Sequence, residues 1–142
     1  MRLILDTNHL TTIQRQTEPA YSRLRARLQT YPPDAVCTTI VNFEEQTRGW
    51  LSLIAASKNI QQEIIAYQRL HTLLAFFGEI HVMDFDETAA KQFAHLRRLK
   101  LRIGAMDMKI AAIAISQNAL LLSSNLRDFQ NIPNLQVEDW AS

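Results

Sequence analysis

The sequence predicts an α/β protein built on a mainly parallel sheet. Short apolar runs recur along the chain, and helical patterns of ten or more residues separate them. Strands that alternate with helices of this length are typical of βαβ units, which join parallel strands through crossovers. The chain has 142 residues, of which 47% are hydrophobic, 3 are Gly and 4 are Pro. We therefore expect one compact domain spanning residues 1–142, without long flexible linkers.

The first expected strand covers residues 2–5, an apolar run that ends at the charged Asp6. Either Thr7 or Asn8 is expected to cap a helix directly after this strand, because both side chains can accept hydrogen bonds from free N–H groups. Leucines spaced four apart predict a second helix over residues 19–28.

The middle of the chain begins with a proline pair at Pro32, which stops the preceding helix. β-Branched residues after this pair predict a strand over residues 35–40. Apolar stripes predict two long helices, over residues 43–56 and 60–77. Gly78 is expected to end the second helix as its C-cap, and Gly49, within the first, to allow close backbone packing.

The last part begins with an expected strand over residues 80–83. Asp86 has the side chain and position of an N-cap for a helix over residues 87–99. Residues 107–117 are almost entirely apolar, which predicts a helix buried between the sheet and its neighbours. Two further short strands are expected over residues 119–123 and 135–137.

Acidic and amide side chains follow several of these strands. Asp6 ends the first strand, and Glu44 and Glu45 follow the second. Asn125 and Asp128 follow the fourth, and Asp107 opens the apolar helix. Ligands of open α/β sheets bind at the carboxyl ends of the strands, so these side chains are expected to converge. Converging carboxylates repel one another unless a cation holds them, which predicts a divalent metal site and metal-dependent phosphate chemistry.

Composition excludes several other classes of protein. The single Cys37 can form no disulfide within the chain and no Cys-based zinc site. The four His are scattered without ligand spacing, and no Ser/His/Asp arrangement or glycine-rich phosphate loop can be read. No run is long enough to span a membrane, and no secretory signal opens the chain. A cytoplasmic protein is the simplest expectation, and the net charge of +1 indicates nothing about the partner.

Four segments, taken in order, resemble the PIN-domain nucleases, and in particular the VapC-type toxin ribonucleases of toxin–antitoxin pairs. They are residues 3–8 (Leu-Ile-Leu-Asp-Thr-Asn), 45–49 (Glu-Gln-Thr-Arg-Gly), 103–112 (Ile-Gly-Ala-Met-Asp-Met-Lys-Ile-Ala-Ala) and 121–129 (Leu-Leu-Ser-Ser-Asn-Leu-Arg-Asp-Phe). The ending over residues 132–140 also resembles the usual tail. No single segment is specific for this family, but the order and spacing of all the segments together are specific for it.

The resemblance implies a three-layer α/β/α sandwich around a parallel sheet of four to five strands. It also implies a Mg²⁺ or Mn²⁺ site that cuts a phosphodiester bond in RNA, with Asp6, Glu45 and Asp107 as the metal-binding acids. The family often has Asp at the position of Asn125, which can still bind a metal through its carbonyl oxygen but adds no charge. Asp128 would take that fourth role or orient the attacking water.

Each acid has a structural alternative. Asp6 and Asp107 could be helix N-caps. Glu44 lies four residues before Arg48, as in an ordinary surface ion pair, and only the family's spacing favours Glu45. Asp84 and Asp86 also follow a strand, and we interpret them as a surface residue and a helix cap. Thr7, Asn8 and Ser123 could orient the acids or serve only as caps and turns.

A basic stretch precedes Asp107. It consists of Arg97, Arg98, Lys100 and Arg102, with Lys109 and Arg127 as weaker members. The stretch is either a solvated helix end, stabilised by the helix dipole, or a track for the RNA backbone beside the metal.

The expected helix over residues 60–77 is apolar on more than one side. Its stripe (Ile64, Leu70, Leu73, Leu74 and Phe77) is interpreted as core, whereas Tyr67 and Phe76 leave further apolar surface to be covered. The family resemblance implies an antitoxin partner and a homodimer.

Two alternatives to the nuclease remain. The missing fourth carboxylate suggests a PIN-like module that binds RNA or protein without cutting. A phosphotransferase of the haloacid-dehalogenase kind also uses an Asp after its first strand, but it needs a second Asp two positions later, where this chain has Asn8.

Overall fold

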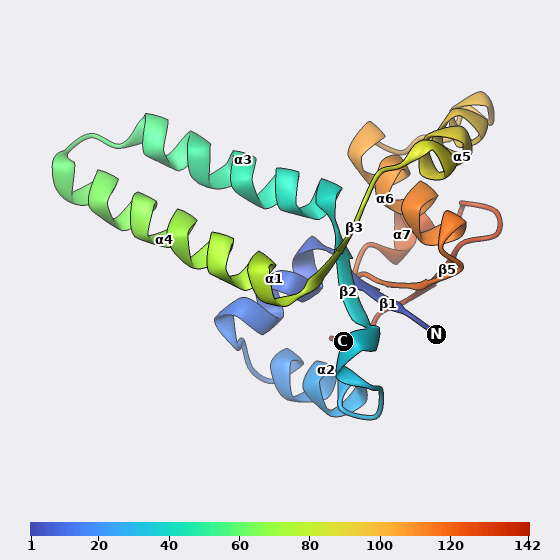
Figure 1. Cartoon of the computed structure of the whole chain (residues 1–142), viewed down its shortest axis with the longest axis horizontal. Helices are drawn as coiled ribbons and strands as arrows, with labels where there is room; N and C mark the ends of the chain where they lie inside the picture. Colours follow the sequence, from blue (N-terminus) through green and yellow to red (C-terminus); the bar gives the residue numbers. More distant parts are fainter.

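A computed structural model describes residues 1–142 and confirms the predicted α/β class. Its five strands form one all-parallel sheet in the order β3-β2-β1-β4-β5 (Figure 1). The strands are β1 (Leu3–Leu5), β2 (Val36–Thr39), β3 (His81–Met83), β4 (Leu120–Leu122) and β5 (Gln136–Glu138). The helices are α1 (Thr7–Arg15), α2 (Ala20–Leu28), α3 (Ile40–Ala56), α4 (Ile60–Glu79), α5 (Glu87–Arg98), α6 (Ala105–Ser116) and α7 (Leu126–Phe129), with one 3₁₀ turn at Pro33–Ala35.

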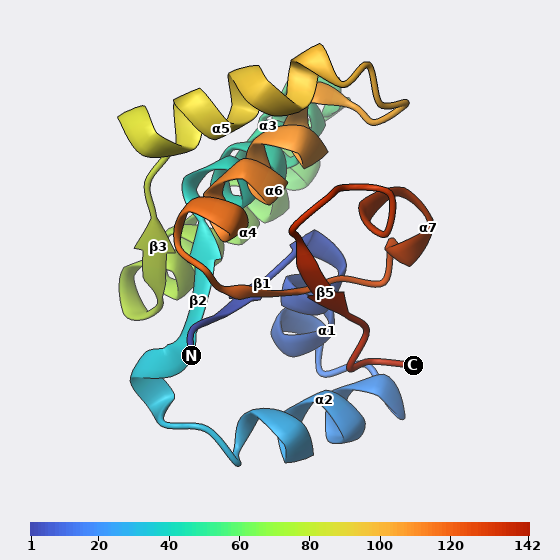
Figure 2. The same cartoon turned by 90° about the vertical axis from the view of Figure 1, so that its right-hand side faces the viewer.

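Alternation of side chains along the central strand produces the three layers. Leu3 and Leu5 point to one face of the sheet, where they pack in a core with residues of α1, α2 and α4. Ile4 points to the other face and packs with residues of α5, α6 and α7. Both faces of the sheet are thus covered by helices (Figure 2), as parallel sheets require. The predicted α/β/α sandwich is confirmed.

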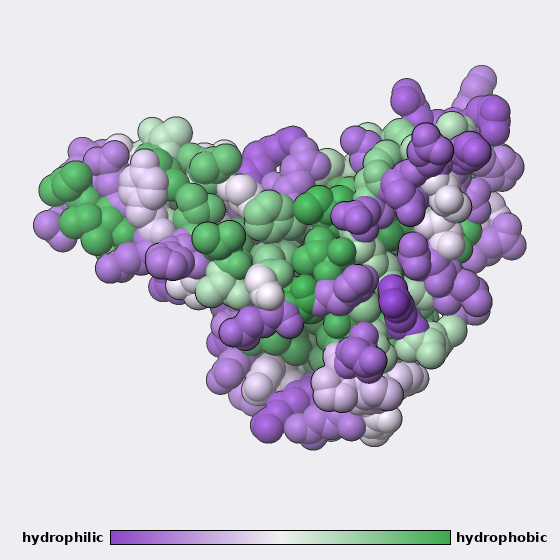
Figure 3. Space-filling view, in the orientation of Figure 1, coloured by the Kyte–Doolittle hydropathy of each residue, from purple (hydrophilic) through white to green (hydrophobic).

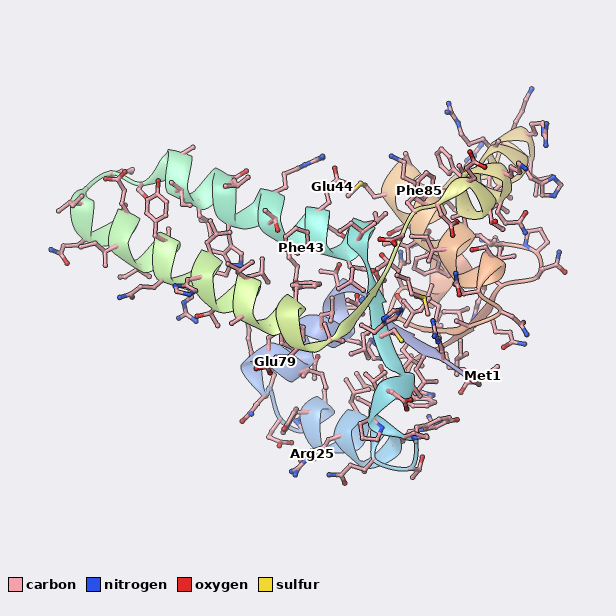
Figure 4. The ribbon with its side chains drawn as sticks, viewed as in Figure 1. Met1, Arg25, Phe43, Glu44, Glu79 and Phe85 are labelled. Carbon is pink, nitrogen blue, oxygen red and sulfur yellow. The ribbon has the colours of Figure 1, made fainter.

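Helices α3 and α4 form a hairpin that extends well beyond the sheet (Figure 1). At its base, Phe43 of α3 points toward α4 and meets Phe77 edge-on, with 5.0 Å between ring centroids (Figure 4). Further out, apolar side chains face solvent (Figure 3): Leu74 is 64% exposed and Leu53 is 53% exposed. The predicted stripe of α4 is therefore core only at Leu73 and Phe77. Leu74 lies between them in sequence but points to another side of the helix.

Several predicted boundaries are wrong by a few residues. Helix α3 begins at Ile40, because the Thr39 side chain caps it by accepting a hydrogen bond from the Asn42 N–H. Gly78 is not a C-cap: it lies inside α4, which runs straight into extended backbone without a left-handed turn. Gly49 does not allow a close approach either, since a Cβ there would meet no atom within 4 Å.

None of the helices has the length and hydrophobicity needed to cross a lipid bilayer.

Candidate active site

The strand order places a topological switch point between β1 and β4. From β1 the chain moves outward through β2 to β3, and it then returns to the other side of β1 to form β4 and β5. The carboxyl ends of the two strands that flank a switch point diverge and leave a crevice, the usual ligand site of such sheets. Asp6 follows β1 and Ser123 follows β4, so both side chains lie at this crevice.

Asp6 is the buried centre of the site, only 5% exposed. Its Oδ1 accepts a hydrogen bond of 2.9 Å from the Asn42 amide, and its Oδ2 accepts one of 2.7 Å from the Ser123 hydroxyl. Although Asp6 precedes α1 as its N-cap residue, its side chain makes no capping hydrogen bond. The capping alternative for Asp6 is therefore wrong, because the carboxylate faces the site instead.

Glu45 reaches the same site from the first turns of α3. Its Oε1 accepts a 2.9 Å hydrogen bond from the Thr7 hydroxyl, which in turn accepts one from the Asn42 amide. Partial burial raises the pKa of Glu45, and the nearby charge of Asp6 adds to this, against the lowering effect of the Thr7 hydrogen bond. Thr7 and Asn42 therefore connect Glu45 to Asp6 in one network.

Asp107 lies opposite, in the first turn of α6. The N-cap of α6 is Gly104, so the capping alternative for Asp107 is also wrong. Burial, together with the charges of Asp6, Glu45 and Asp128, raises the pKa of Asp107 to about 6, and a hydrogen bond from Asn125 acts in the opposite direction. The other three carboxylates are thus close enough to interact electrostatically with Asp107, and the predicted convergence of these acids is confirmed.

Asn125 lies between two of these acids. Its amide nitrogen is 3.3 Å from Oδ2 of Asp107 and 3.2 Å from Oδ2 of Asp128. Both distances fit weak N–H···O hydrogen bonds, in which the amide supplies the positive end of a dipole to two negative groups. In this arrangement, the amide occupies the position that a cation would take between the two carboxylates.

The donor set fits a hard divalent cation. Mg²⁺ and Mn²⁺ prefer oxygen ligands, and Mg²⁺ commonly uses one or two protein carboxylates while keeping several waters. As the side chains stand, no three His, Cys, Asp or Glu form a group that could hold an ion. Ion binding would therefore require side chains of the site to rearrange, and Asp107 and Asn125 are only half-buried.

The three predicted orienting residues have different roles. Thr7 and Ser123 each donate to a site acid, which confirms that they contact the acids. Asn8 touches no acid: its Oδ1 accepts from the Ser124 N–H and lies 3.0 Å from Nδ1 of the buried His9. Asn8 thus fixes the loop after β4 rather than the carboxylates.

Asn42 was missed by the sequence analysis. It is fully buried and is held by the Thr39 hydroxyl, which donates to its Oδ1 at 2.7 Å. A Thr directly after a strand, followed three residues later by a polar side chain, is the pattern of a helix N-terminus with reciprocal capping. That pattern would have placed α3 correctly and directed attention to Asn42.

The structural alternatives for the remaining acids are confirmed. Glu44 pairs with Arg48 at the surface of α3. Asp86 caps α5 by accepting a 2.9 Å hydrogen bond from the Ala89 N–H, and Asp84 is exposed. None of these three acids hydrogen-bonds to Asp6, Glu45 or Asp107, although the charge of Glu44 helps to raise the pKa of its neighbour Glu45.

The predicted basic stretch lies at the end of α5 and in the loop that leads to α6 (Figure 2). Arg97, Arg98, Lys100 and Arg102 are all exposed and form no ion pair. Because α6 begins directly after this loop, the stretch adjoins the turn that carries Asp107.

Comparison with known proteins identifies relatives over the full chain. The family profile described as "PIN domain" matches residues 3–135. The "tRNA(fMet)-specific endonuclease VapC" of Salmonella typhimurium is 28% identical, and the match covers 99% of each chain. The "Ribonuclease VapC1" of Haemophilus influenzae is 26% identical, also over 99% of each. Among solved structures, DNA-bound VapBC from Salmonella typhimurium has a TM-score of 0.75 at 26% identity, covering 99% of this chain and 98% of that one.

Proposed function

The chain belongs to the PIN-domain family, and from this premise we propose that it is a metal-dependent endoribonuclease, the toxin of a toxin–antitoxin pair. The observation that carries the proposal is the convergence of Asp6, Glu45, Asp107 and Asp128 at one crevice, where the charges of the other three help to raise the pKa of Asp107. Oxygen ligands without a Ser, Cys or His nucleophile favour hydrolysis assisted by a cation. Full-length relatives with ribonuclease names support the choice of RNA as substrate.

In this proposal Asp6, Glu45 and Asp107 bind Mg²⁺ or Mn²⁺. Such an ion lowers the pKa of a water nucleophile and neutralises charge that develops on the phosphate. Ser123 and Asn42 fix both oxygens of Asp6, and Thr7 fixes one oxygen of Glu45. The fourth position belongs to Asn125, through its carbonyl oxygen after the amide has turned, or to Asp128, which can also orient the attacking water.

We place the RNA backbone along Arg97, Arg98, Lys100 and Arg102. An acidic site repels a polyanion, so positive charge beside it is needed to bring the substrate in. Between Glu87 and Asp107 the sequence has five Lys or Arg and no Asp or Glu. Contacts of this kind would position the strand without selecting a sequence.

Cleavage of total RNA tests the proposal. We expect the wild type to produce discrete fragments with Mg²⁺ or Mn²⁺ and none with a chelator. Asp6→Asn and Asp107→Asn should abolish cleavage while the protein stays folded, whereas Glu44→Gln, a neighbouring acid outside the site, should cut as the wild type does. Cleavage at the wild-type rate by Asp6→Asn would contradict the assignment.

Protein partners are part of the proposal. The α3–α4 hairpin leaves apolar side chains exposed, including Ile60, Ile65 and Leu74, and exposed apolar surface of this kind marks association sites. We propose that a second copy of the chain and a cognate antitoxin cover it, as suggested by similar structures that are complexes of VapB with VapC. Light scattering of the purified chain should give the mass of a dimer, and Leu74→Gln should shift that mass toward the monomer.

The second candidate function is a PIN-like module that binds RNA or protein without cutting. The observation that favours it is Asn125, which supplies an amide where a fourth carboxylate would strengthen the cation site. Calorimetric titration separates the two functions, because the module should not bind Mn²⁺ at millimolar concentration.

A further inference from the structure

A second feature lies beside α6, on the side that faces α5. A cavity of about 380 Å³ opens between the two helices. Its apolar lining comes from Phe93, Leu101, Ile103 and Met108, and Arg97 and Lys109 complete it. This volume lies within the range of roughly 300–1,000 Å³ that is typical of pockets for small ligands.

The two cations of this cavity lie over aromatic rings. The Arg97 guanidinium carbon is 5.6 Å from the centroid of the Phe93 ring, and the Lys109 ammonium is 5.7 Å from the same centroid. Lys109 is also 5.9 Å from the ring of Phe85, which meets Phe93 edge-on. Distances near 6 Å are the outer limit of cation–π attraction, so the rings hold the cations in place only weakly.

Neither cation has a carboxylate partner. Both charges therefore remain available to an anion at the edge of an apolar cavity. An aromatic ring and an apolar wall with adjacent positive charge is the combination that binds single-stranded nucleic acid, where bases stack and cations hold the phosphates.

The position of the cavity relates it to the acidic site. Lys109 follows Asp107 by two residues, and on a helix this separates their side chains by about 200°. Asp107 thus faces the acids on one side of the first turn of α6, and the cavity lies on the other side. A strand that crosses this turn would meet both.

We propose that this cavity is a subsite for one nucleotide of the bound RNA strand, across the first turn of α6 from the acids. Its base lies in the cavity against Phe93, and its phosphate is held between Arg97 and Lys109. The inference rests on the proposed ribonuclease function, which makes RNA the ligand. The subsite would contact a base, whereas the exposed basic stretch would contact only the backbone.

Fluorescence anisotropy with a labelled ten-nucleotide uridine RNA tests the subsite, in chelator so that no cleavage occurs. We expect Phe93→Leu to raise the Kd about tenfold, as loss of a stacked base does, and Phe93→Tyr to retain wild-type affinity. Replacing one nucleotide of the RNA by an abasic one should weaken binding to the wild type but not to Phe93→Leu. Melting temperatures of the variants show that each is folded.

The charged residues provide a second measurement that does not depend on Phe93. Lys109→Met and Arg97→Gln should each reduce the slope of log Kd against log salt by roughly 0.7, as expected for one lost phosphate contact. The matched control is Arg25→Gln, an exposed arginine on α2 that lies far from Phe85 and this cavity (Figure 4). It should change neither the affinity nor the slope.

Unchanged RNA binding by Phe93→Leu and Lys109→Met would overturn the subsite, as would an equal loss in Arg25→Gln. If the cavity takes a side chain of a protein partner instead, all RNA measurements stay at wild-type values, and the proposal is wrong. These outcomes are distinct from failure of the ribonuclease. If RNA binding depends on Phe93 but no cleavage occurs, the subsite is supported and the ribonuclease proposal is wrong. If cleavage occurs and does not depend on Phe93, the ribonuclease is supported and the subsite is wrong.

Discussion

The two sides of the acidic crevice are built differently. On the β1 side, Asp6 is buried and both of its oxygens accept hydrogen bonds, from Asn42 and Ser123. On the α6 side, Asp107 is half-buried and accepts a weak hydrogen bond of 3.3 Å from the amide of Asn125. Asp6 is thus held by two hydrogen bonds, whereas Asp107 is half-buried, has one weak hydrogen bond and has a raised pKa.

This difference suggests a division of roles within one site. The hydrogen bonds around Asp6 hold both oxygens of this buried side chain in place, so Asp6 is a fixed anchor of the site. Asp107 is instead repelled by three other acids, against which the Asn125 amide acts through one weak hydrogen bond, and a cation would relieve this repulsion further. We therefore expect Asp6 to control the geometry of the site and Asp107 to control its response to pH and metal.

Removal of the anchor charge should have the largest effect. Asp6→Asn keeps the size of the side chain but removes the charge that Ser123 and Asn42 position, and we expect RNA cleavage to fall by about a thousandfold or more. Steady-state cleavage of a defined fragment measures the effect. Loss of less than tenfold would show that Asp6 is not the anchor.

Loss of a hydrogen bond that holds Asp6 in place should have the next largest effect. Ser123→Ala removes the 2.7 Å hydrogen bond to Oδ2 of Asp6, and we expect both cleavage and Mn²⁺ affinity to fall about 10- to 100-fold, as for other groups that orient metal ligands. Ser116→Ala is the matched control, because its hydroxyl donates only to the backbone carbonyl of Ile113 at the far end of α6. A purely structural role for Ser123 would lower stability and leave the Mn²⁺ affinity unchanged.

Adding a fourth carboxylate next to Asp107 tests the α6 side of the site. Asn125→Asp replaces the amide between Asp107 and Asp128 by a further negative charge. We expect Mn²⁺ to bind about tenfold more tightly, because each added charge favours the cation. The pKa of Asp107 in the metal-free variant should also rise, which carboxylate NMR shifts would detect. Weaker metal binding by this variant would show that the amide itself is the better ligand.

The smallest effect concerns stability. Asp107 has a pKa of about 6 in the folded chain, above the ordinary value of 3.8 for this side chain, so the folded state binds its proton more tightly than the unfolded state does. Its ionisation therefore destabilises the protein fully above pH 6, and the penalty disappears as the pH falls below about 4. The shift corresponds to at most about 3 kcal/mol, which solvent screening of a half-exposed group reduces to about 1 kcal/mol.

Asp107→Asn should accordingly raise the free energy of unfolding at pH 7.5 by about 1 kcal/mol, or the Tm by about 3 °C, and change it little at pH 4. Saturating Mn²⁺ should remove the advantage of the variant, because the ion relieves the same repulsion in the wild type. Asp84→Asn, at an exposed acid outside the site, is the control and should stay within about 0.5 kcal/mol of the wild type. A destabilised Asp107→Asn at pH 7.5 would contradict the account.

Much of this architecture could be predicted from the sequence, because short runs of neighbouring residues determine the type and burial of the strands. The runs that became β1 and β4 are short, wholly apolar and bounded by polar residues, so their type and burial could be predicted. Once the sheet was expected to be parallel, the acids after its strands had to meet at one edge. The side chain that joins them, Asn42, depends on a helix starting at Ile40, and helix boundaries are what apolar periodicity determines least well.

The α3–α4 hairpin shows a different limit. Periodicity correctly indicated two helices with apolar stripes, but it carries no information about how far they extend past the sheet. Leu73 and Phe77 are buried because they lie on the face of α4 that packs in the core, whereas Leu74, between them in sequence, points to another side of the helix and is exposed. Whether an apolar stripe is core or surface depends on the layer beside it, which only the tertiary structure supplies.

Calorimetric titration of the metal-free protein with Mn²⁺ at pH 6 tests the central claim most directly. Repeated in two buffers of different ionisation enthalpy, it measures both affinity and proton release. The account predicts that the wild type binds Mn²⁺ and releases about half a proton, the share that a carboxyl with a pKa of about 6 holds at this pH. It also predicts that Asp107→Asn releases none and that Asp6→Asn binds far more weakly. Absence of binding at millimolar Mn²⁺, or equal binding by all three proteins, would contradict the claim that these acids form a cation site.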